Sequence, residues 1–249
     1  MVLTDAGEVL SFGHGTDGQL GHGDHATQYV PKVIEALRGT RVVAIAAGGN
    51  HSMVLTDEGA VLSFGLGTYG QLGHGSKRDY SVPKLVEALE EPVRSVAASN
   101  TSSFAVSVNG RVYSWGASEY GELGHEDMNE DGDGHAHELL PRPVQALLQE
   151  CITAVVAGPT YSLALAANGA MYSWGFGMDG QLGRAEAETR SDCNYLPERV
   201  ALEGVCGMAA GEAHTVAVVQ DGRAFGWGSG RNCALGLELD EDDNGDAVD

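Results

Sequence analysis

A short glycine pattern occurs five times along this chain and restricts the folds that it can adopt. In each copy, a glycine is followed six positions later by a second glycine that comes directly after Phe or Trp. The second glycines are Gly13, Gly65, Gly116, Gly175 and Gly228. They are separated by 52, 51, 59 and 53 residues. A period near 50 residues with only short apolar runs inside each unit is typical of propellers and solenoids, in which one repeat is one structural unit.

The second copy illustrates what one unit contains. The run VVAIAAGG (42–49) is apolar and rich in small residues, which predicts an innermost strand where neighbouring units crowd together. The next two runs, 52–56 and 60–65, predict a hairpin, because the loop between them ends in Gly59 and its equivalents read Asn-Gly or Asp-Gly. The run KLVEAL (84–89) predicts a fourth, outer strand. Four such strands make one antiparallel blade of a propeller.

The recurring residues resemble the regulator of chromosome condensation (RCC1-type) repeat. The resemblance rests on Ser-Phe-Gly-x-Gly-x-x-Gly-Gln-Leu-Gly-His-Gly at 63–75 and on Ala-Gly-x-x-His-Ser/Thr at 47–52 and 210–215. A near copy of the longer motif is at 11–23, with variants at 114–125 and 173–183. The resemblance covers nearly the whole chain. It implies a β-propeller, and complete rings in this family normally have seven blades.

The predicted fold class is therefore all-β, a propeller of four-stranded antiparallel blades with about five repeats. Three repeats are full and two are partial, since the first lacks its inner strand and no outer strand follows Cys233-Ala234-Leu235-Gly236. We expect an incomplete seven-bladed ring, and the alternative is a small ring of five units. The expected organisation is a propeller over 1–237 and an acidic, disordered tail over 238–249.

The charge distribution argues against direct binding of nucleic acid. The chain has a formal net charge of −21, with six acids in 126–138, seven in 238–249, and no Lys or Arg in either segment. Nucleic-acid binding requires clustered cations, and none are present. No run of apolar residues is long enough to cross a membrane, and the four cysteines show no paired spacing. These features predict an intracellular protein, cytoplasmic or nuclear, with no membrane contact.

Two patterns suggest chemistry but have simpler structural explanations. The sequence Gly-x-Gly-x-x-Gly at 13–18, 65–70 and 175–180 matches the dinucleotide-binding pattern, which requires a helix to open at the third glycine. Here Gln-Leu-Gly follows, which predicts a turn. Histidines also recur by repeat, whereas catalytic histidines converge from different elements on one point. We therefore predict no catalytic residue, no cofactor site and no enzymatic activity.

One segment matches a calcium-binding loop. Residues 127–138 fit the pattern D-x-[DN]-x-[DN]-G-x₅-E, in which alternating carboxylates surround the ion. The predicted ligands are Asp127, Asn129, Asp131, Asp133 and Glu138. The flanking residues do not resemble the helices of a calcium-binding hand. The alternative is a solvated acidic loop with no bound ion.

Two functions follow as hypotheses. The first is a non-enzymatic, regulatory protein-interaction scaffold, because the variable segments fall in loops between the third and fourth strands, where a propeller displays specificity. The second is implied by the family resemblance: a guanine-nucleotide exchange factor for a Ran-like small GTPase. In the founding member of that family a wedge replaces the ordinary glycine loop of one blade, whereas the loop at 121–124 here is an ordinary repeat loop. The first hypothesis is therefore preferred, with a protein partner.

Overall fold

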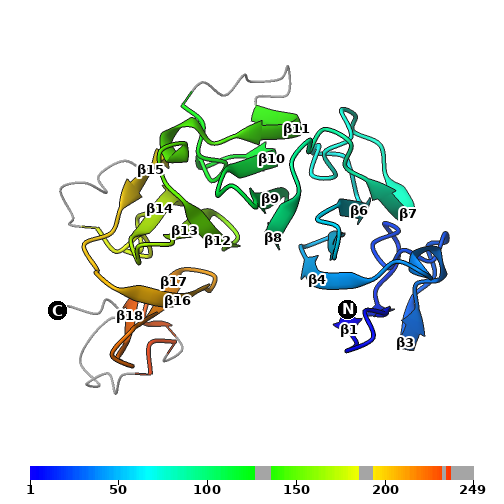
Figure 1. Ribbon diagram of the computed structural model, residues 1–249, viewed down its shortest axis with the longest axis horizontal. Helices are drawn as coiled ribbons and strands as arrows, with labels where there is room; N and C mark the ends of the chain where they lie inside the picture. Colours follow the sequence, from blue (N-terminus) through cyan, green and yellow to red (C-terminus); the bar gives the residue numbers. More distant parts are fainter. Residues whose placement is uncertain (127–135, 185–192, 232–233, 237–249) are drawn as a thin grey trace.

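The computed structural model describes residues 1–126, 136–184, 193–231 and 234–236. The calcium-loop residues 127–135 and the acidic tail lie outside this part of the chain. Five antiparallel sheets stand side by side in an open arc, with the first and last sheets at its two ends (Figure 1). The open arc agrees with the expected incomplete ring and differs from a closed ring of five units.

Each sheet is one blade, and blades are numbered here in chain order. Blade 1 has strands β1 (Val2–Leu3), β2 (Val9–Gly13) and β3 (Gln28–Val33). Blade 2 has β4 (Val42–Ala47), β5 (His51–Thr56), β6 (Val61–Gly65) and β7 (Tyr80–Leu85). Blade 3 has β8 (Val93–Ala98), β9 (Ser102–Ser107), β10 (Val112–Ser118) and β11 (Ala136–Pro143). Blade 4 has β12 (Ile152–Ala157), β13 (Tyr161–Ala166), β14 (Met171–Phe176) and β15 (Cys193–Arg199). Blade 5 has β16 (Val205–Ala210), β17 (His214–Val219) and β18 (Ala224–Gly228). Two single-turn 3₁₀ helices, η1 (Glu35–Leu37) and η2 (Gln145–Leu147), follow β3 and β11.

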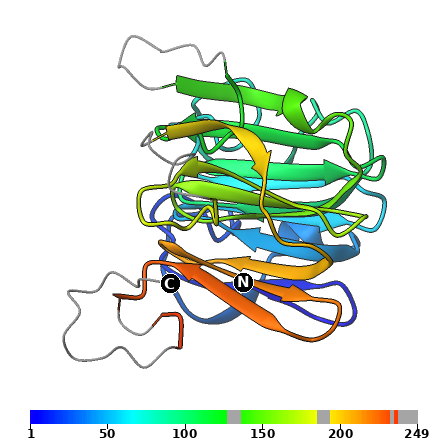
Figure 2. The same cartoon turned by 90° about the vertical axis from the view of Figure 1, so that its left-hand side faces the viewer.

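Within the described residues, three four-stranded and two three-stranded sheets confirm the count of three full and two partial repeats. The inner strands β4, β8, β12 and β16 lie toward the middle of the arc, and each contacts its neighbour. Their small residues permit this close approach, as the run VVAIAAGG predicts. The turned view shows the strands of successive sheets stacked with similar orientation (Figure 2). Four apolar clusters fill the spaces between consecutive blades.

The hairpin glycines have the backbone conformation that the sequence predicts. Gly59 has a φ of +82°, and its N–H donates to the carbonyl of Thr56 (3.0 Å). The N–H of Thr56 in turn donates to the carbonyl of Ala60 (2.9 Å). This is a three-residue loop whose last position is left-handed, a conformation that glycine adopts without strain.

The prediction for the outer strand was wrong in position. The fourth strand of blade 2 is Tyr80–Leu85, and it does not extend over KLVEAL (84–89). Pro83 lies within the strand, at a bulge where the register slips between Ser63 and Gly65. A proline has no N–H to donate, so it is tolerated in an outer strand at a bulge. Reading Pro83 as part of the preceding loop moved the predicted strand toward the C-terminus.

One backbone carbonyl in each of blades 1 to 4 accepts hydrogen bonds from the next blade. In blade 2 the carbonyl of Gln71 accepts from Ser103 Oγ (2.8 Å) and Trp115 Nε1 (2.9 Å). We call this arrangement the latch. The other latches are Ser52 to Gln19 O, Ser162 and Trp174 to Glu122 O, and Thr215 and Trp227 to Gln181 O. Trp115 and Trp174 are fully buried and Trp227 is partly buried, so all three indoles pack between blades.

The latch also explains the glycine that ends each Gly-Gln-Leu-Gly loop. A Cβ atom added to Gly73 would lie 2.8 Å from Nε1 of Trp115, closer than real side chains approach. Gly183 faces Trp227 in the same way. Phe12, the equivalent aromatic of blade 1, has no preceding blade to pack on and is 44% exposed, whereas Phe64 is fully buried.

Candidate functional site

The structure describes only the last of the five predicted calcium ligands. Glu138 lies in β11, where its Oε1 accepts a hydrogen bond from Arg142 Nη1 at 2.8 Å. Asp127, Asn129, Asp131 and Asp133 lie outside the described residues. Among the residues that are described, no group of three His, Cys, Asp or Glu is arranged to hold a metal ion.

Calcium binding at this segment therefore stays a prediction. Bidentate coordination by Glu138 would require its ion pair with Arg142 to break, because Arg142 already binds one carboxylate oxygen. Calorimetric titration of the full chain with CaCl₂ tests the site, with magnesium as the control cation. Saturable heat with calcium alone would support the loop, and no heat at millimolar calcium would dismiss it.

The dinucleotide-like glycine patterns form turns, as predicted. In blade 2 the N–H of Gly70 donates to Gly67 O (2.8 Å) and that of Gly73 to Gly70 O (2.9 Å). A Cβ atom at Gly67 would lie within 2.0 Å of the carbonyl of Arg78, so only glycine fits there. No helix opens after these glycines in the described chain, whose helical segments are η1 and η2.

The recurring histidines pair with serines in a way that does not suit catalysis. Nε2 of His22, His74 and His125 lies 2.9 to 3.1 Å from the hydroxyl of Ser11, Ser63 and Ser114. Each of these hydroxyls donates its proton to a leucine carbonyl 2.6 Å away. The histidine must therefore donate to the serine, which is the reverse of a base activating a nucleophile. Arg184 takes the same place in blade 4.

His51 is the most buried of the histidines that the structure describes, and it links two blades. Its Nε2 lies 2.8 Å from Ser103 Oγ of blade 3, and the ring is 1% exposed. Burial lowers the pKa of His51 to about 4. Burial, together with the nearby Lys84, also lowers the pKa of His74 to about 4. Both rings are neutral at physiological pH and contribute to packing.

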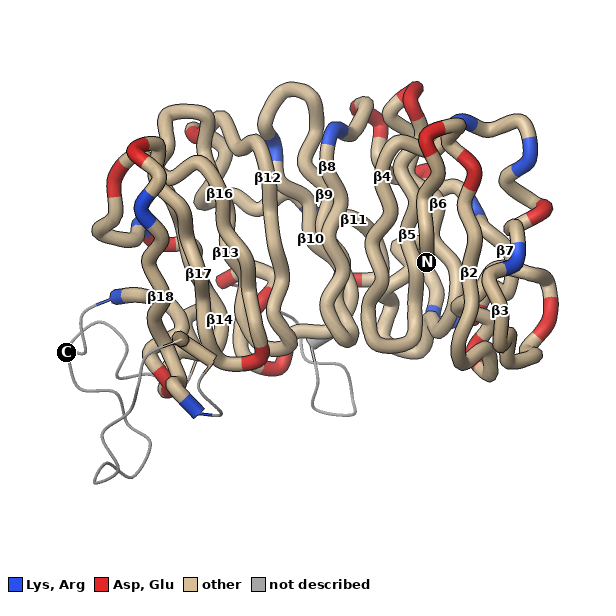
Figure 3. Tube along the Cα trace, turned by 90° about the horizontal axis from the view of Figure 1, so that it is seen from below, with Lys and Arg blue, Asp and Glu red and all other residues tan. Residues whose placement is uncertain are grey.

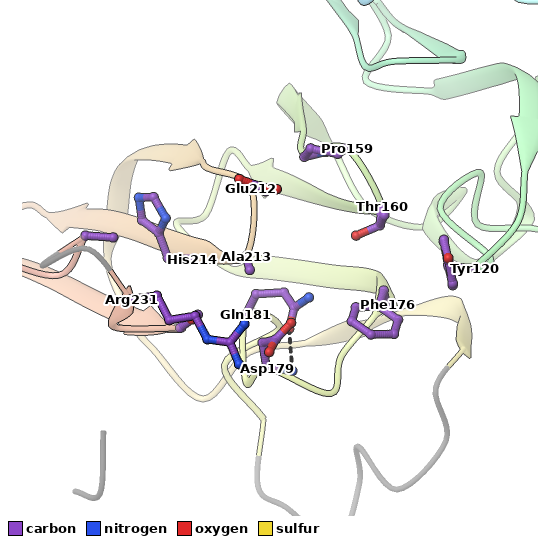
Figure 4. A pocket seen from close by; sticks show the side chains of 12 residues that line it. Tyr120, Pro159, Thr160, Phe176, Asp179, Gln181, Glu212, Ala213, His214 and Arg231 are labelled. Carbon is purple, nitrogen blue, oxygen red and sulfur yellow. Dashed lines mark hydrogen bonds between the residues drawn. The ribbon is translucent and has the colours of Figure 1, made fainter. Parts of the chain in front are cut away.

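A cleft of about 620 Å³ opens between blades 4 and 5 and extends to a loop of blade 3 (Figure 4). Blade 4 contributes the β12–β13 turn (159–160) and the loop after β14 (176–181). Blade 5 contributes the β16–β17 turn (212–214) and the segment after β18. Tyr120 comes from the loop after β10. Sequence reasoning could not find this site, because its residues come from three repeats.

Hydrogen bonds of the main chain fix the frame of the cleft. The N–H of Phe176 donates to Thr160 O (2.9 Å), and the N–H of Ser229 donates to Ala213 O (2.8 Å). Gln181 Oε1 accepts from the N–H of Asp179 (3.0 Å). Gln181 is fully buried, so its side chain stabilises the loop and does not contribute to the exposed rim of the cleft.

The side chains of the cleft combine an aromatic side with a charged rim. Tyr120 and Phe176 are half-buried and meet edge to face, with ring centroids 5.2 Å apart. Figure 4 shows them on one side of the cleft and Arg231 and His214 on the other. Arg231 is exposed, as are two lining carboxylates, Asp179 and Glu212. Half-buried aromatics beside exposed charges are typical of surfaces that bind another protein.

A buried carboxyl group lies directly beneath this aromatic side and was not identified from the sequence. Glu122 is 3% exposed and occupies the loop position that Gln19, Gln71 and Gln181 hold in other blades. Its carboxylate accepts from the N–H of Tyr120 (2.8 Å), and its carbonyl is the latch acceptor for blade 4. Burial raises the pKa of Glu122 to about 7. The sequence carried one signal that could have identified this group: the repeat loop has Glu at 122, where the other three loops have Gln.

The charged residues of the described chain lie mainly in loops at the two ends of the strands (Figure 3). Carboxylates predominate, as the net charge of −21 requires. The part of the chain that the structure describes contains no helix long and apolar enough to cross a bilayer.

Comparison with known proteins places these features in one family. A sequence model described as RCC1-like domain matches residues 1–248. The chain is 33% identical over 246 residues to the ultraviolet-B receptor UVR8 of Arabidopsis thaliana, an alignment that covers 98% of this chain and 54% of the receptor. The chain thus spans about half the length of this relative.

Solved structures match the arrangement of the blades as well. Human WBSCR16 aligns with a TM-score of 0.80 and 26% identity, covering 94% of this chain and 60% of that chain. Prp20p from Saccharomyces cerevisiae, described with its binding to Gsp1p and histones, aligns with a TM-score of 0.74 and 27% identity. That alignment covers 92% of this chain and 55% of Prp20p. The blades described above are therefore arranged like those of the matched structures.

Proposed function

Because this chain belongs to the family of RCC1-like domains, we propose that it is a non-enzymatic, regulatory module that binds a protein partner. The observation that carries the proposal is the cleft of blades 3 to 5. It offers the half-buried pair Tyr120 and Phe176 on a frame fixed by main-chain hydrogen bonds. Rigid aromatic anchors beside exposed charges favour protein recognition.

The contacts of the described residues also support a role without chemistry. In the Ser–His pairs the imidazole donates its proton to the serine hydroxyl, whereas a catalytic histidine would accept the proton of the serine. The glycine loops form turns. We therefore propose no catalytic residue and no cofactor for this chain. A nuclear or cytoplasmic location and the absence of direct contact with nucleic acid are parts of the same proposal.

Affinity purification followed by mass spectrometry tests the cleft. We expect at least one protein that is captured by the wild-type chain to be reduced about tenfold or more by Tyr120→Ser and by Glu212→Lys, the loss typical of a binding hot spot. Glu212→Lys changes an exposed side chain, whereas Tyr120→Ser also removes the ring contact with Phe176 of blade 4, so thermal unfolding of each variant checks that it folds. Direct titration of the identified partner against each purified variant then gives the change in dissociation constant.

Two control variants distinguish a loss of partner binding at the cleft from a general loss of binding. Tyr29→Ser removes an aromatic ring that is 92% exposed on β3, far along the chain from the cleft. Glu58→Lys makes the same charge change at an exposed hairpin. Equal loss of the partner with the control and the cleft variants would contradict the assignment of binding to this cleft.

The alternative is a guanine-nucleotide exchange factor for a Ran-like small GTPase. The similarity to Prp20p, which is described with its binding to Gsp1p, favours it. Against it, the loop at 121–124 has the same glycine conformations as its counterpart in blade 2, with φ of +83° and +81° against +79° and +73°. The two functions can be distinguished by measuring the release of a fluorescent nucleotide from preloaded Ran after the chain is added. A large acceleration of release would favour the exchange factor, and an unchanged rate would favour the binding module.

A further inference from the structure

The cleft of blades 3 to 5 holds two carboxylates that have no ion-pair partner among the described residues. Asp179 lies on the loop after β14 and Glu212 in the β16–β17 turn, so each of blades 4 and 5 supplies one of them (Figure 4). Both side chains are exposed, and the hydrogen bond of Asp179 to Gln181 Oε1 uses its main-chain N–H. Arg231 also lines the cleft and, within the described chain, pairs with neither carboxylate. The lining therefore carries an excess of negative charge.

The aromatic side of the cleft suits a flat cation. Tyr120 and Phe176 are half-buried and line the cleft, so part of each ring is open to an incoming group. Their edge-to-face contact and the hydrogen bond from the Phe176 N–H to Thr160 O fix the rings in place. A guanidinium stacks on such rings because it is planar and more weakly hydrated than an ammonium group. Its N–H groups can donate to carboxylates at the same time.

Other classes of occupant fit this lining less well. An acidic group would be repelled by Asp179 and Glu212, and an apolar side chain would cover both carboxylates without pairing them, which costs free energy. The tail 238–249 carries seven acids and no Lys or Arg, so its charge has the wrong sign. The cleft volume of about 620 Å³ lies within the range of roughly 300–1,000 Å³ for pockets that enclose small ligands. One long side chain with its main chain can therefore enter.

We propose that the cleft binds an arginine side chain of the partner protein, presented on an exposed, extended segment. The guanidinium stacks on the aromatic pair, and its N–H groups donate to Asp179 and Glu212. The inference rests on the function proposed above, because it names the chemistry of the partner that the cleft binds. Arginine and tyrosine are both enriched among the residues that dominate binding at protein interfaces.

A pair of peptides tests this chemistry directly. The probe is acetyl-GSGRGSG-amide, and its control has citrulline in place of arginine, which keeps the shape of the side chain and removes its charge. On titration into the full chain, we expect the NMR signals of the Tyr120 and Phe176 rings to shift in a saturable way with the arginine peptide and not with the citrulline control. A peptide with lysine at this position is expected to bind about two- to fivefold more weakly, the size of a stacking contact at an exposed site.

Three neutral variants give the proposal a definite sign. Asp179→Asn and Glu212→Gln are each expected to weaken binding of the arginine peptide about two- to fivefold, the size of an exposed charge pair. Arg231→Gln is expected to strengthen it by about the same factor, because a like charge is removed from the rim. Glu58→Gln, at an exposed hairpin, is the matched control and is expected to change nothing. Thermal unfolding followed by circular dichroism checks that each variant folds.

Four results would overturn the proposal. Equal shifts with the citrulline peptide would show that the cleft does not recognise the charge. Equal weakening by Glu58→Gln would show a general attraction to a chain of net charge −21. Weaker binding by Arg231→Gln would assign the cleft to an anionic group. Ring signals that shift in Arg190→Gln without any peptide would assign the cleft to the chain's own segment 185–192, which lies outside the described residues.

The arginine inference and the proposed function can fail separately. If Tyr120→Ser and Glu212→Lys reduce a captured protein but the arginine and citrulline peptides bind alike, the cleft binds its partner by other chemistry, and only the arginine inference fails. If the arginine peptide binds as expected but neither variant reduces any captured protein, the cleft recognises arginine, and the proposed regulatory function fails.

Discussion

Replacing Trp174 with Ala is expected to lower the free energy of unfolding by about 3–5 kcal/mol, the range for removal of a large aromatic side chain from a core. The indole is fully buried between blades 3 and 4. It lies edge to face with Phe104, at 6.4 Å between ring centroids, and its Nε1 donates to the carbonyl of Glu122 at 2.7 Å. The alanine variant loses both contacts and leaves a cavity. Urea unfolding followed by circular dichroism measures the change.

Trp174→Phe is the matched control, because Phe64 occupies the equivalent place in blade 2. The phenyl ring preserves most of the packing, removes the latch donor and fills slightly less volume than the indole. We expect a loss of about 1–2 kcal/mol, the size of one buried hydrogen bond and a small change in volume. Equal losses in the two variants would show that the hydrogen bond, and not the packing, dominates this interface. A loss below about 1 kcal/mol for Trp174→Ala would contradict the latch as a source of stability.

We expect the wild-type chain to become less stable as the pH rises, because of Glu122, and we expect Glu122→Gln to abolish this pH dependence. The pKa of Glu122 is about 7 in the folded chain, compared with an ordinary value of 4.5. Between these values the folded chain holds a proton that the unfolded chain has released, so stability falls as the pH rises from 4.5 through 7. The loss is complete above that range and amounts to about 3 kcal/mol. The glutamine variant has no proton to lose at this position.

The two pH profiles should cross. At low pH the wild-type carboxyl is neutral, and the variant is expected to be the less stable chain, because a buried amide nitrogen at this position has no partner among the described residues at the equivalent Gln71 and Gln181. Above pH 7 the variant should be the more stable chain. The reciprocal change, Gln71→Glu, is expected to introduce a second loss of the same sign. Parallel profiles for wild type and Glu122→Gln, measured by urea unfolding from pH 5 to 9, would refute the raised pKa.

The blade architecture was predictable because its determinants repeat. Gly59 and its equivalents specify the hairpins, and the small residues of VVAIAAGG specify the inner strand. The number of full and partial blades followed from the spacing of these signals and from the copies that lack an inner or an outer strand. The outer strand was misplaced because Pro83 was taken to end a loop, whereas a bulge accommodates it inside the strand.

The candidate site was less predictable for a physical reason. Tyr120, Phe176 and Glu212 come from three different repeats, and only the lateral packing of the blades brings them to one cleft. Glu122 was overlooked because the loop at 121–124 matches Gly-Gln-Leu-Gly in its other three positions, and its burial depends on that same packing. The predicted calcium ligands fall largely outside the described residues, and that prediction stays open.

The latch has one direction: a donor in each blade reaches back to an acceptor in the blade before it. Every junction is therefore chemically complete with only two neighbours present, and none needs the two ends of the chain to meet. A protein built in this way can gain or lose whole units at either end without redesign of the joints that remain. The latches themselves therefore set no limit on the number of units.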